Sequence, residues 1–360
     1  MMTTLDILHE RLHNHHIVGT PFEKPADVVQ WLGAVQAQDY GAAKWALGLR
    51  TRGVSDADID RAFAEGAILR THVMRPTWHF VLPADIRWML ALTAPRIKAQ
   101  VAYYDRKLEL DDALYARSNT ILAKALEGGN QLTRSEIASI LQDAGIATDD
   151  LLRLGYIVGR AELDAVVCSG ARRGKQFTYA LLDERVPQAK TLERDEALAE
   201  LARRYFTSHG PATLQDYIWW SGLSAADARA GLDMVKSGFI REDADAQTYW
   251  FAASTPITNG LDSTVHLLPN YDEYIVGYTE RSALFDMQHT GKLDSRGNVL
   301  FNHTIVIDGQ IVGTWKRTVS KRAVGIEPNP FIALTSTQSD ALAAAAARYG
   351  DFLSLPAVLA

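Results

Sequence analysis

The fold is decided by the stretch from Thr71 to Leu82, THVMRPTWHFVL, which predicts two β-strands broken at Pro76. Proline cannot donate to a strand ladder, so it belongs at the turn rather than inside either strand. Helical patterns precede this hairpin: residues 4–17 are apolar at helical spacing, Pro25 stands at a favoured first helical position, and Ser55 suits the N-cap of a helix over 56–65. Three helices followed by a hairpin predict a winged helix over residues 1–82.

The same plan returns twice along the chain. Thr133 is expected to cap a helix over 134–142, Asp149 a helix to about 162, and two strands flank the basic turn 170–175. Helices at about 194–208, 213–221 and 224–237, with a hairpin closing at 248–251, form the third copy. The sequence therefore predicts an α+β protein with three tandem winged-helix motifs.

The domain boundaries follow from this repeat. We expect winged helices over 1–82, 131–190 and 191–255, a helical connector over 83–130, and a β-rich C-terminal part over 256–360. In that last part strands are expected at 265–268, 274–278, 299–307 and 311–315, with a tight turn at Asp308-Gly309 and a final helix over 341–348.

Composition limits the class of protein. A chain of 360 residues with 47% hydrophobic and 22% charged residues is folded, and too long for one hydrophobic core. No apolar run approaches the roughly 18 residues of a membrane span, and the N-terminus lacks a signal-peptide core, so a cytoplasmic protein without a membrane partner is expected. The single cysteine, Cys168, excludes an intramolecular disulfide and is interpreted as a small core residue.

A net charge of −6 gives no overall attraction to DNA, so any contact with phosphates must come from local basic clusters. One cluster is Arg172, Arg173 and Lys175 at the expected wing tip of the second copy; the other is Lys316 with Arg317. The alternative for each is a solvated turn without a ligand.

The first helix contains a possible metal motif. His9-Glu10-Arg11-Leu12-His13 matches the H-E-x-x-H pattern of zinc peptidases. It lies close to the terminus and no third-ligand motif follows it, so coincidence is the better interpretation. We expect neither a metal nor another cofactor.

Two amides two residues apart, Gln36 and Gln38, stand where the helix that begins at Pro25 gives way, with Gly41 expected to end it. On a continuous helix they would point about 200 degrees apart. Joint action on one substrate therefore requires the backbone to leave helical geometry here. The alternative is an ordinary hydrogen-bonding pair at a helix end.

Several motifs together resemble one family. They are Leu12-His13-Asn14, WLGAVQAQDY (31–40), KWALGLR (44–50), HGPAT (209–213), WWSGL (219–223), LPNYDEY (268–274) and GTW (313–315). In combination they resemble the winged-helix DNA glycosylase family typified by AlkZ-type azinomycin-resistance enzymes. The resemblance covers most of the chain and implies a DNA-binding body of tandem winged helices that hydrolyses the N-glycosidic bond of alkylated purines in duplex DNA.

The family's catalytic pattern of glutamine, apolar residue, glutamine falls on Gln36, Ala37 and Gln38, whereas the YcaQ-type branch is expected to carry an acid at the second position. An N7-alkylated purine is already cationic and leaves as a neutral base, so neutral amides that orient a water and face an oxocarbenium-like sugar suffice. Further residues that could line the site are Arg75, Trp78, His79, Tyr271 and Asp272. Pro76 departs from the glycine expected after the arginine.

Two other functions remain open at the level of sequence. One is a winged-helix transcription regulator that binds DNA without chemistry; the expected recognition helices, however, offer few base-reading side chains, mainly Arg153 and Arg160. The other is the zinc peptidase on His9 and His13. Duplex DNA is the expected partner, and no obligate protein partner is predicted.

Overall fold

Helices and strands are mixed along the whole chain in the computed structural model, which describes residues 3–244, 246–253, 264–293 and 296–359. The chain divides by its contacts into a first unit, Met1–Ile59 with Ala199–Ala360, and a second, Asp60–Leu198. The predicted mixture of α and β structure is confirmed. The five segments predicted from the sequence are defined by repeated motifs, whereas these two units are defined by contacts. The segment boundaries therefore stay a prediction.

The N-terminal part of the first unit is helical, as predicted. Its elements are α1 (Thr4–Asn14), α2 (Pro25–Leu32), β1 (Val35–Gln36) and α3 (Tyr40–Gly48), after which the chain enters α4 (Asp56–Glu65). Pro25 is the first residue of α2, and the Ser55 hydroxyl accepts the Asp58 N–H at 3.2 Å. Gly41, expected to end a helix, lies instead in the first turn of α3.

A helical group with a hairpin follows residue 190, again as predicted. It comprises α10 (Arg194–Ser208), α11 (Leu214–Ser221), α12 (Ala225–Val235), η1 (Lys236–Gly238), β7 (Ile240–Ala244) and β8 (Gln247–Phe251). Thr213 caps α11 through a capping box with Asp216, and Gly222 ends it in a left-handed conformation. The rings of Tyr205, Tyr217 and Trp220 pack together beneath these helices.

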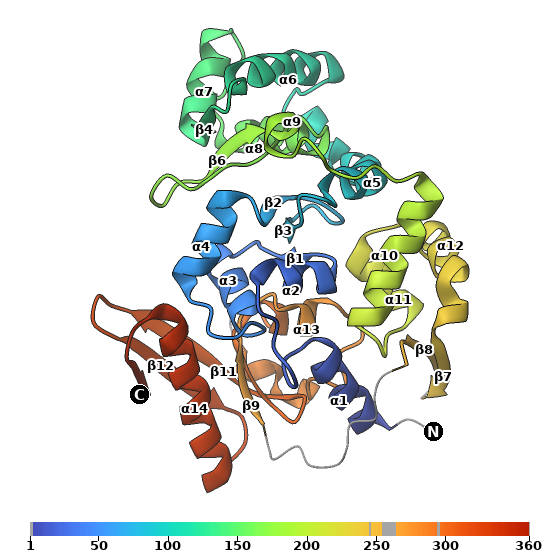
Figure 1. The fold of residues 1–360 in the computed structure, drawn as a ribbon, viewed down its shortest axis with the longest axis vertical. Helices are drawn as coiled ribbons and strands as arrows, with labels where there is room; N and C mark the ends of the chain where they lie inside the picture. Colours follow the sequence, from blue (N-terminus) through green and yellow to red (C-terminus); the bar gives the residue numbers. More distant parts are fainter. Residues whose placement is uncertain (1–2, 245, 254–263, 294–295, 360) are drawn as a thin grey trace. The chain divides into compact units, whose positions relative to one another are not determined.

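The C-terminal part holds a sheet in the order β13-β12-β11-β10-β9, with α14 packed against β9 (Figure 1). Its elements are β9 (Val265–Leu268), α13 (Glu273–Val276), η2 (Met287–Lys292), η3 (Val299–Phe301), β10 (Thr304–Ile307), β11 (Gln310–Val319), β12 (Val324–Pro330), α14 (Ser336–Leu353) and β13 (Ala357–Leu359). Asp308 (φ 49°) and Gly309 (φ 86°) form the predicted tight turn.

Two strand predictions in this part are corrected. Residues 274–278, read as a strand from their aromatic and β-branched side chains, begin in helix α13 because the Asp272 carboxylate accepts the Tyr274 N–H at 2.9 Å and caps it. Residues 299–307 are a strand only from Thr304, since the 3-10 turn η3 occupies their first part.

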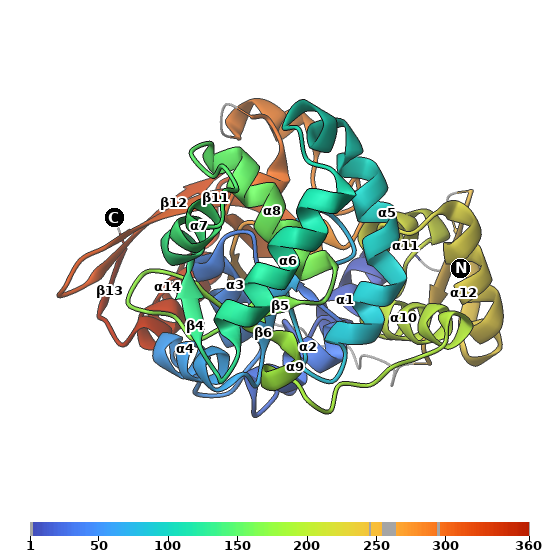
Figure 2. The same cartoon turned by 90° about the horizontal axis from the view of Figure 1, so that it is seen from above.

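The second unit carries the predicted hairpin and helices. It contains β2 (Leu69–His72), β3 (Trp78–Val81), α5 (Ile86–Lys107), α6 (Asp112–Leu126), β4 (Gln131–Thr133), α7 (Arg134–Asp143), α8 (Leu151–Leu163), β5 (Val167–Ser169), β6 (Thr178–Leu181) and α9 (Leu182–Arg185). Helix α8 packs against both α5 and α6 (Figure 2). The sheet has the order β4-β6-β5. Thr133 caps α7 as predicted, whereas α8 is capped by Asp150 instead of Asp149.

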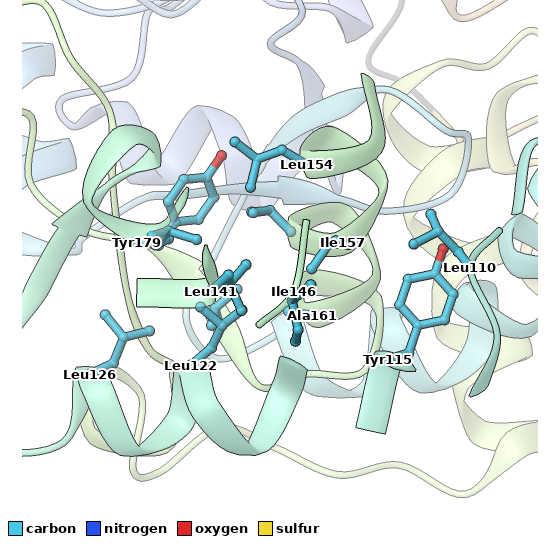
Figure 3. Packing of buried hydrophobic residues seen from close by; sticks show 13 residues of the cluster. Leu110, Tyr115, Leu122, Leu126, Leu141, Ile146, Leu154, Ile157, Ala161 and Tyr179 are labelled. Carbon is cyan, nitrogen blue, oxygen red and sulfur yellow. The ribbon is translucent and has the colours of Figure 1, made fainter. Parts of the chain in front are cut away.

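The core of the second unit lies between α6, α7 and α8. Leu122 and Leu126 from α6 face Leu154, Ile157 and Ala161 from α8 (Figure 3). Cys168 on β5 is fully buried, and burial raises the pKa of its thiol to about 12, so the prediction of a core cysteine is confirmed. Within the described ranges, no helix is long and apolar enough to cross a membrane.

Candidate active site

The glutamine pair lies at a break between two helices. Gly33, with φ 81°, ends α2, Val35 and Gln36 are extended as β1, and the Asp39 carboxylate accepts the Ala42 N–H at 3.0 Å to begin α3. Helical geometry thus stops before Gln36, which is the condition that joint action of the pair requires. Gln36 is the last residue of the extended segment, and Gln38 lies in the bend that precedes α3. The backbone no longer forces Gln36 and Gln38 apart.

The two glutamines differ in exposure. Gln36 is 6% exposed, whereas Gln38 is exposed to solvent. The backbone N–H of Gln36 donates to Glu273 Oε1 at 2.6 Å. The pair therefore combines one residue held in the interior with one that solvent or a ligand can reach.

Glu273, on α13, is the interior anchor of this segment. Its side chain is 1% exposed; Oε2 accepts the indole N–H of Trp220 at 2.9 Å and lies 3.6 Å from His209 Nε2. Burial lowers the pKa of His209 below its usual value, although Glu273 opposes the shift. The carboxylate thus joins the glutamine segment to α11 and to the end of α10. The motifs quoted from the sequence contain Glu273, Trp220 and His209, but no pattern of spacing indicated that they meet.

Asp272 belongs to the frame beneath the segment rather than to an open surface. Its carboxylate is 0% exposed and accepts both Arg50 Nη1 at 2.9 Å and Nη2 at 2.7 Å. Arg50 also donates to the carbonyls of His15 and Ala46. The neighbouring Tyr271 is half-buried with φ 58°, and its ring lies 5.8 Å from that of Phe301. Of the two, Tyr271 is the one that retains exposed surface.

Arg317, predicted to contact DNA, lies at the first turn of α3. A Cβ placed on Gly41 would come within 3.2 Å of Arg317 Nη2 and 3.7 Å of Asp39 Oδ1. The guanidinium also contacts the Tyr349 hydroxyl. Lys316, the preceding residue on β11, is exposed. The structure therefore places a cation next to the glutamine segment, and the small size of Gly41 leaves room for it.

His303 is a further residue of this region that sequence reasoning missed. Its Nδ1 accepts the Asn270 N–H at 2.9 Å, and its ring lies 4.9 Å from that of Trp315. Burial, with the nearby Arg317 charge, lowers the pKa of His303 to about 4, while Asp39 opposes this shift. The ring is therefore neutral at pH 7, and Nδ1, which accepts a hydrogen bond, leaves the proton on Nε2.

The remaining predicted lining residues, Arg75, Trp78 and His79, lie in the second unit, on or beside the β2–β3 hairpin. Arg75 is half-buried; its backbone N–H donates to the Val73 carbonyl at 2.8 Å in the tight turn that contains Pro76. Trp78 is half-buried beneath the Arg70 guanidinium, 4.2 Å from its ring centre. His79 is fully buried, donates from Nδ1 to the Thr77 carbonyl at 2.9 Å, and has a pKa well below its usual value because of burial. This environment suits packing better than proton transfer.

The basic turn of the second unit is partly engaged within the protein. Arg173 pairs with Glu136 at 2.7 Å, and Arg172 lies 3.6 Å from Asp60 while covering the Phe177 ring. Lys175 is exposed at the turn. A ligand phosphate would meet Lys175 directly and would compete with carboxylates for the two arginines.

Helix α1, which contains the H-E-x-x-H pattern, is packed against the rest of the first unit through Arg11. On α1, Arg11 is 2% exposed, donates from Nε to the Pro211 carbonyl at 2.9 Å and covers the Tyr278 ring at 3.7 Å. Across the described ranges no group of three or more His, Cys, Asp or Glu side chains is arranged to hold a metal ion.

Comparison with known proteins finds a matching family and similar chains. The model of the family described as DNA glycosylase AlkZ-like matches residues 29–352. A curated protein of Streptomyces sahachiroi, the interstrand DNA cross-link repair glycosylase, is 24% identical over 313 residues, which is 81% of each chain. The solved structure of Streptomyces sahachiroi DNA glycosylase AlkZ matches all of both chains with a TM-score of 0.82 at 20% identity.

Proposed function

The chain belongs to the DNA glycosylase AlkZ-like family, and on this premise we propose that it hydrolyses the N-glycosidic bond of alkylated, N7-substituted purines in duplex DNA. The observation that carries this proposal is the break between α2 and α3, where the buried Gln36 is followed by the exposed Gln38 and the Arg317 guanidinium lies next to Gly41. The protein would act as a cytoplasmic, monofunctional base excision repair enzyme on alkylation damage, without a metal or other cofactor and without an obligate protein partner.

Neutral amides match the chemistry of a cationic leaving group. When the bond between C1′ and N9 breaks, its electron pair moves to the purine, which leaves neutral, and the sugar becomes oxocarbenium-like. Water then bonds to C1′ and releases a proton to solvent. The amide oxygens of Gln36 and Gln38 accept hydrogen bonds from this water and face the developing positive charge. An undamaged purine, which must be protonated to leave, receives no acid from the pair.

Because Gln36 is buried and Gln38 is exposed, we assign them different parts in the reaction. Gln38 meets solvent and approaches the water and the sugar from the exposed side, whereas Gln36 orients the water from a position fixed by its backbone bond to Glu273. Through Trp220 and His209, Glu273 fixes the segment to buried helices. Such prior positioning lowers the entropy that must be lost when the reacting groups align.

Duplex DNA is the proposed partner, bound by tandem winged helices. In the second unit α6-β4-α7-α8-β5-β6, with sheet order β4-β6-β5, has the connectivity of a winged helix, and in the first unit α10, α11, α12 and the β7–β8 hairpin follow a similar plan. Phosphate contacts are assigned to Lys175 with Arg172 and Arg173, and to Lys316 with Arg317. Tyr271 keeps partial exposure and remains a candidate for lining the site.

The rival function, a regulator that reads base edges, receives less support. Arg153 donates to the carbonyls of Ala147 and Leu108, and Arg160 pairs with Asp112 and Asp164. The arginines that a recognition helix α8 would offer to DNA are therefore already engaged.

The function is tested by incubating the protein with duplex DNA that contains N7-methylguanine, and separately with undamaged duplex, and by counting abasic sites. We expect release of the methylated base alone. An interstrand DNA cross-link, the lesion for which the Streptomyces sahachiroi relative is named, serves as a second substrate. No release from either lesion, together with tight binding to particular undamaged sequences, would favour the regulator.

A further inference from the structure

The second unit contains a cavity that the glutamine pair does not involve. Its volume is about 310 Å³, and it lies between α8, α5 and the β2–β3 hairpin. Trp78, Tyr156 and Tyr179 contribute aromatic walls, and Leu151 and Leu152, 75% and 49% exposed, contribute to the lining at the start of α8. Ligand sites occupy about 300–1,000 Å³, so this cavity matches a ligand of one or two rings.

The face of helix α8 that lines the cavity carries two glycines. Leu154, Ile157 and Ala161 of the helix enter the core, whereas Gly155 and Gly159, one turn apart, line the cavity. A Cβ at Gly159 would meet no atom within 4 Å, and at Gly155 only the flexible end of Arg134 is nearby. Each glycine within a helix costs about 1 kcal/mol relative to alanine. No packing contact requires a glycine at position 159, and this side of the helix is open.

A buried carboxylate gives the cavity a polar edge. The Glu162 side chain is 2% exposed, lines the cavity, and its Oε2 contacts His72 Nδ1. Among the residues that the structure describes, no other hydrogen bond to this carboxylate is found, so its second oxygen has capacity to accept one. An ionised carboxylate only accepts hydrogen bonds, and a ligand group beside it must donate.

Two of the three Lys and Arg side chains that line the cavity pair with carboxylates. Lys98 and Arg160 both pair with Asp164, and Arg134 donates to the Leu151 carbonyl. A phosphate group would compete with Asp164 for Lys98 and Arg160 and would approach the Glu162 carboxylate. The cavity therefore disfavours nucleotides and favours an uncharged or cationic ring without phosphate.

We propose that this cavity binds a free, planar nitrogen heteroaromatic of nucleobase size, stacked between the aromatic walls and donating a ring N–H to Glu162. Aromatic walls favour a flat ring through offset stacking, and the Glu162 carboxylate, whose Oε2 takes the His72 contact, can accept a ring N–H through its other oxygen. The inference does not rest on the proposed glycosylase function, because all of its residues lie outside the glutamine segment.

The test measures binding of free 7-methylguanine, 3-methyladenine and, as the phosphate-bearing comparison, guanosine monophosphate by titration calorimetry. We expect at least one free base to bind wild type and the monophosphate to bind at least tenfold more weakly. Gly159→Phe fills the space and should weaken the base at least tenfold, and Glu162→Gln about tenfold through loss of a charge-assisted hydrogen bond. Gly159→Ala, the matched control, should bind within threefold of wild type.

The outcomes separate this inference from the glycosylase proposal. Gln38→Ala should bind the base as wild type does, whatever its effect on base release from DNA. Circular dichroism shows whether Gly159→Phe is folded, and Gly159→Ala together with Glu162→Gln keeps the test decisive if it is not. Failure of both free bases to bind, equal binding of base and monophosphate, or unchanged affinity in Glu162→Gln and in any folded Gly159→Phe would overturn the inference.

Discussion

The buried ion pair between Arg50 and Asp272 gives the sharpest prediction about the frame of the site. Asp272→Asn preserves shape but leaves the Arg50 guanidinium, 1% exposed, without its counter-charge. Breaking a buried pair in this way costs about 3–5 kcal/mol. For a unit of 150–250 residues about 2–4 °C is lost per kcal/mol, so the melting temperature of the first unit should fall by about 6–20 °C. Thermal unfolding followed by circular dichroism measures the change.

Two controls make this prediction specific. Arg50→Met with Asp272→Leu removes both charges and should recover most of the lost stability, apart from about 1 kcal/mol for the α13 cap that Asp272 supplies. Glu23→Gln disrupts an exposed ion pair, in which the Glu23 side chain is 68% exposed and the Arg52 side chain 61% exposed. This substitution should change the melting temperature little. An unchanged melting temperature in Asp272→Asn, combined with a 100-fold slower release of N7-methylguanine, would refute this reasoning and assign Asp272 to the chemistry.

Four further predictions follow from the same geometry. Lys316→Ala should weaken DNA binding equally across sequences and should reduce the slope of log affinity against log salt concentration by about 0.9. Fluorescence anisotropy at several salt concentrations measures this slope, and an unchanged slope would argue against a phosphate contact. The single-turnover rate of base release should not change between about pH 6 and 8, because the glutamines do not titrate and burial lowers the pKa of His303 to about 4. A rate that depends on one proton in this range would implicate another titratable residue. Stability should fall as pH drops below 6.5, since burial lowers the pKa of His266 on β9 to about 4 in the folded protein and the unfolded chain takes up the proton first. His266 should account for about 1.4 kcal/mol of the loss per pH unit, and denaturant titrations of His266→Gln should show a slope smaller by that amount. Gly159→Ala should raise the melting temperature by roughly 2–4 °C, because alanine favours the helix by about 1 kcal/mol and meets no atom; a lower melting temperature would contradict the open space.

Local signals predicted most of the elements. Thr133, Pro25 and Ser55 mark helix starts that the structure confirms, and Asp308-Gly309 marks its hairpin, because caps and tight turns depend on a few adjacent residues. The strand expected over 274–278 was wrong because the propensity of its side chains was outweighed by a cap one residue upstream of the helix. Whether strand propensity or a helix cap determines such a segment depends on its tertiary contacts.

The site could be predicted only in part. Gln36 and Gln38 were found through a motif, and the break in the helix was a stated requirement that the structure meets. Glu273 lies 237 positions from Gln36 along the chain, so no periodicity could join it to the segment. Asp272 looked like a residue that lines the site because sequence does not reveal that Arg50 takes both of its oxygens.

The central claim is that the glutamine pair performs the chemistry, and single-turnover release of 7-methylguanine from duplex DNA tests it most directly. The comparison uses saturating wild type, Gln36→Ala, Gln38→Ala and, as a matched control, Gln142→Ala, which removes an exposed glutamine from α7. We predict that Gln38→Ala slows release by about 100-fold, the effect of losing one positioned transition-state contact, that Gln36→Ala also slows it, and that Gln142→Ala does not. Equal rates for all four proteins would contradict the claim.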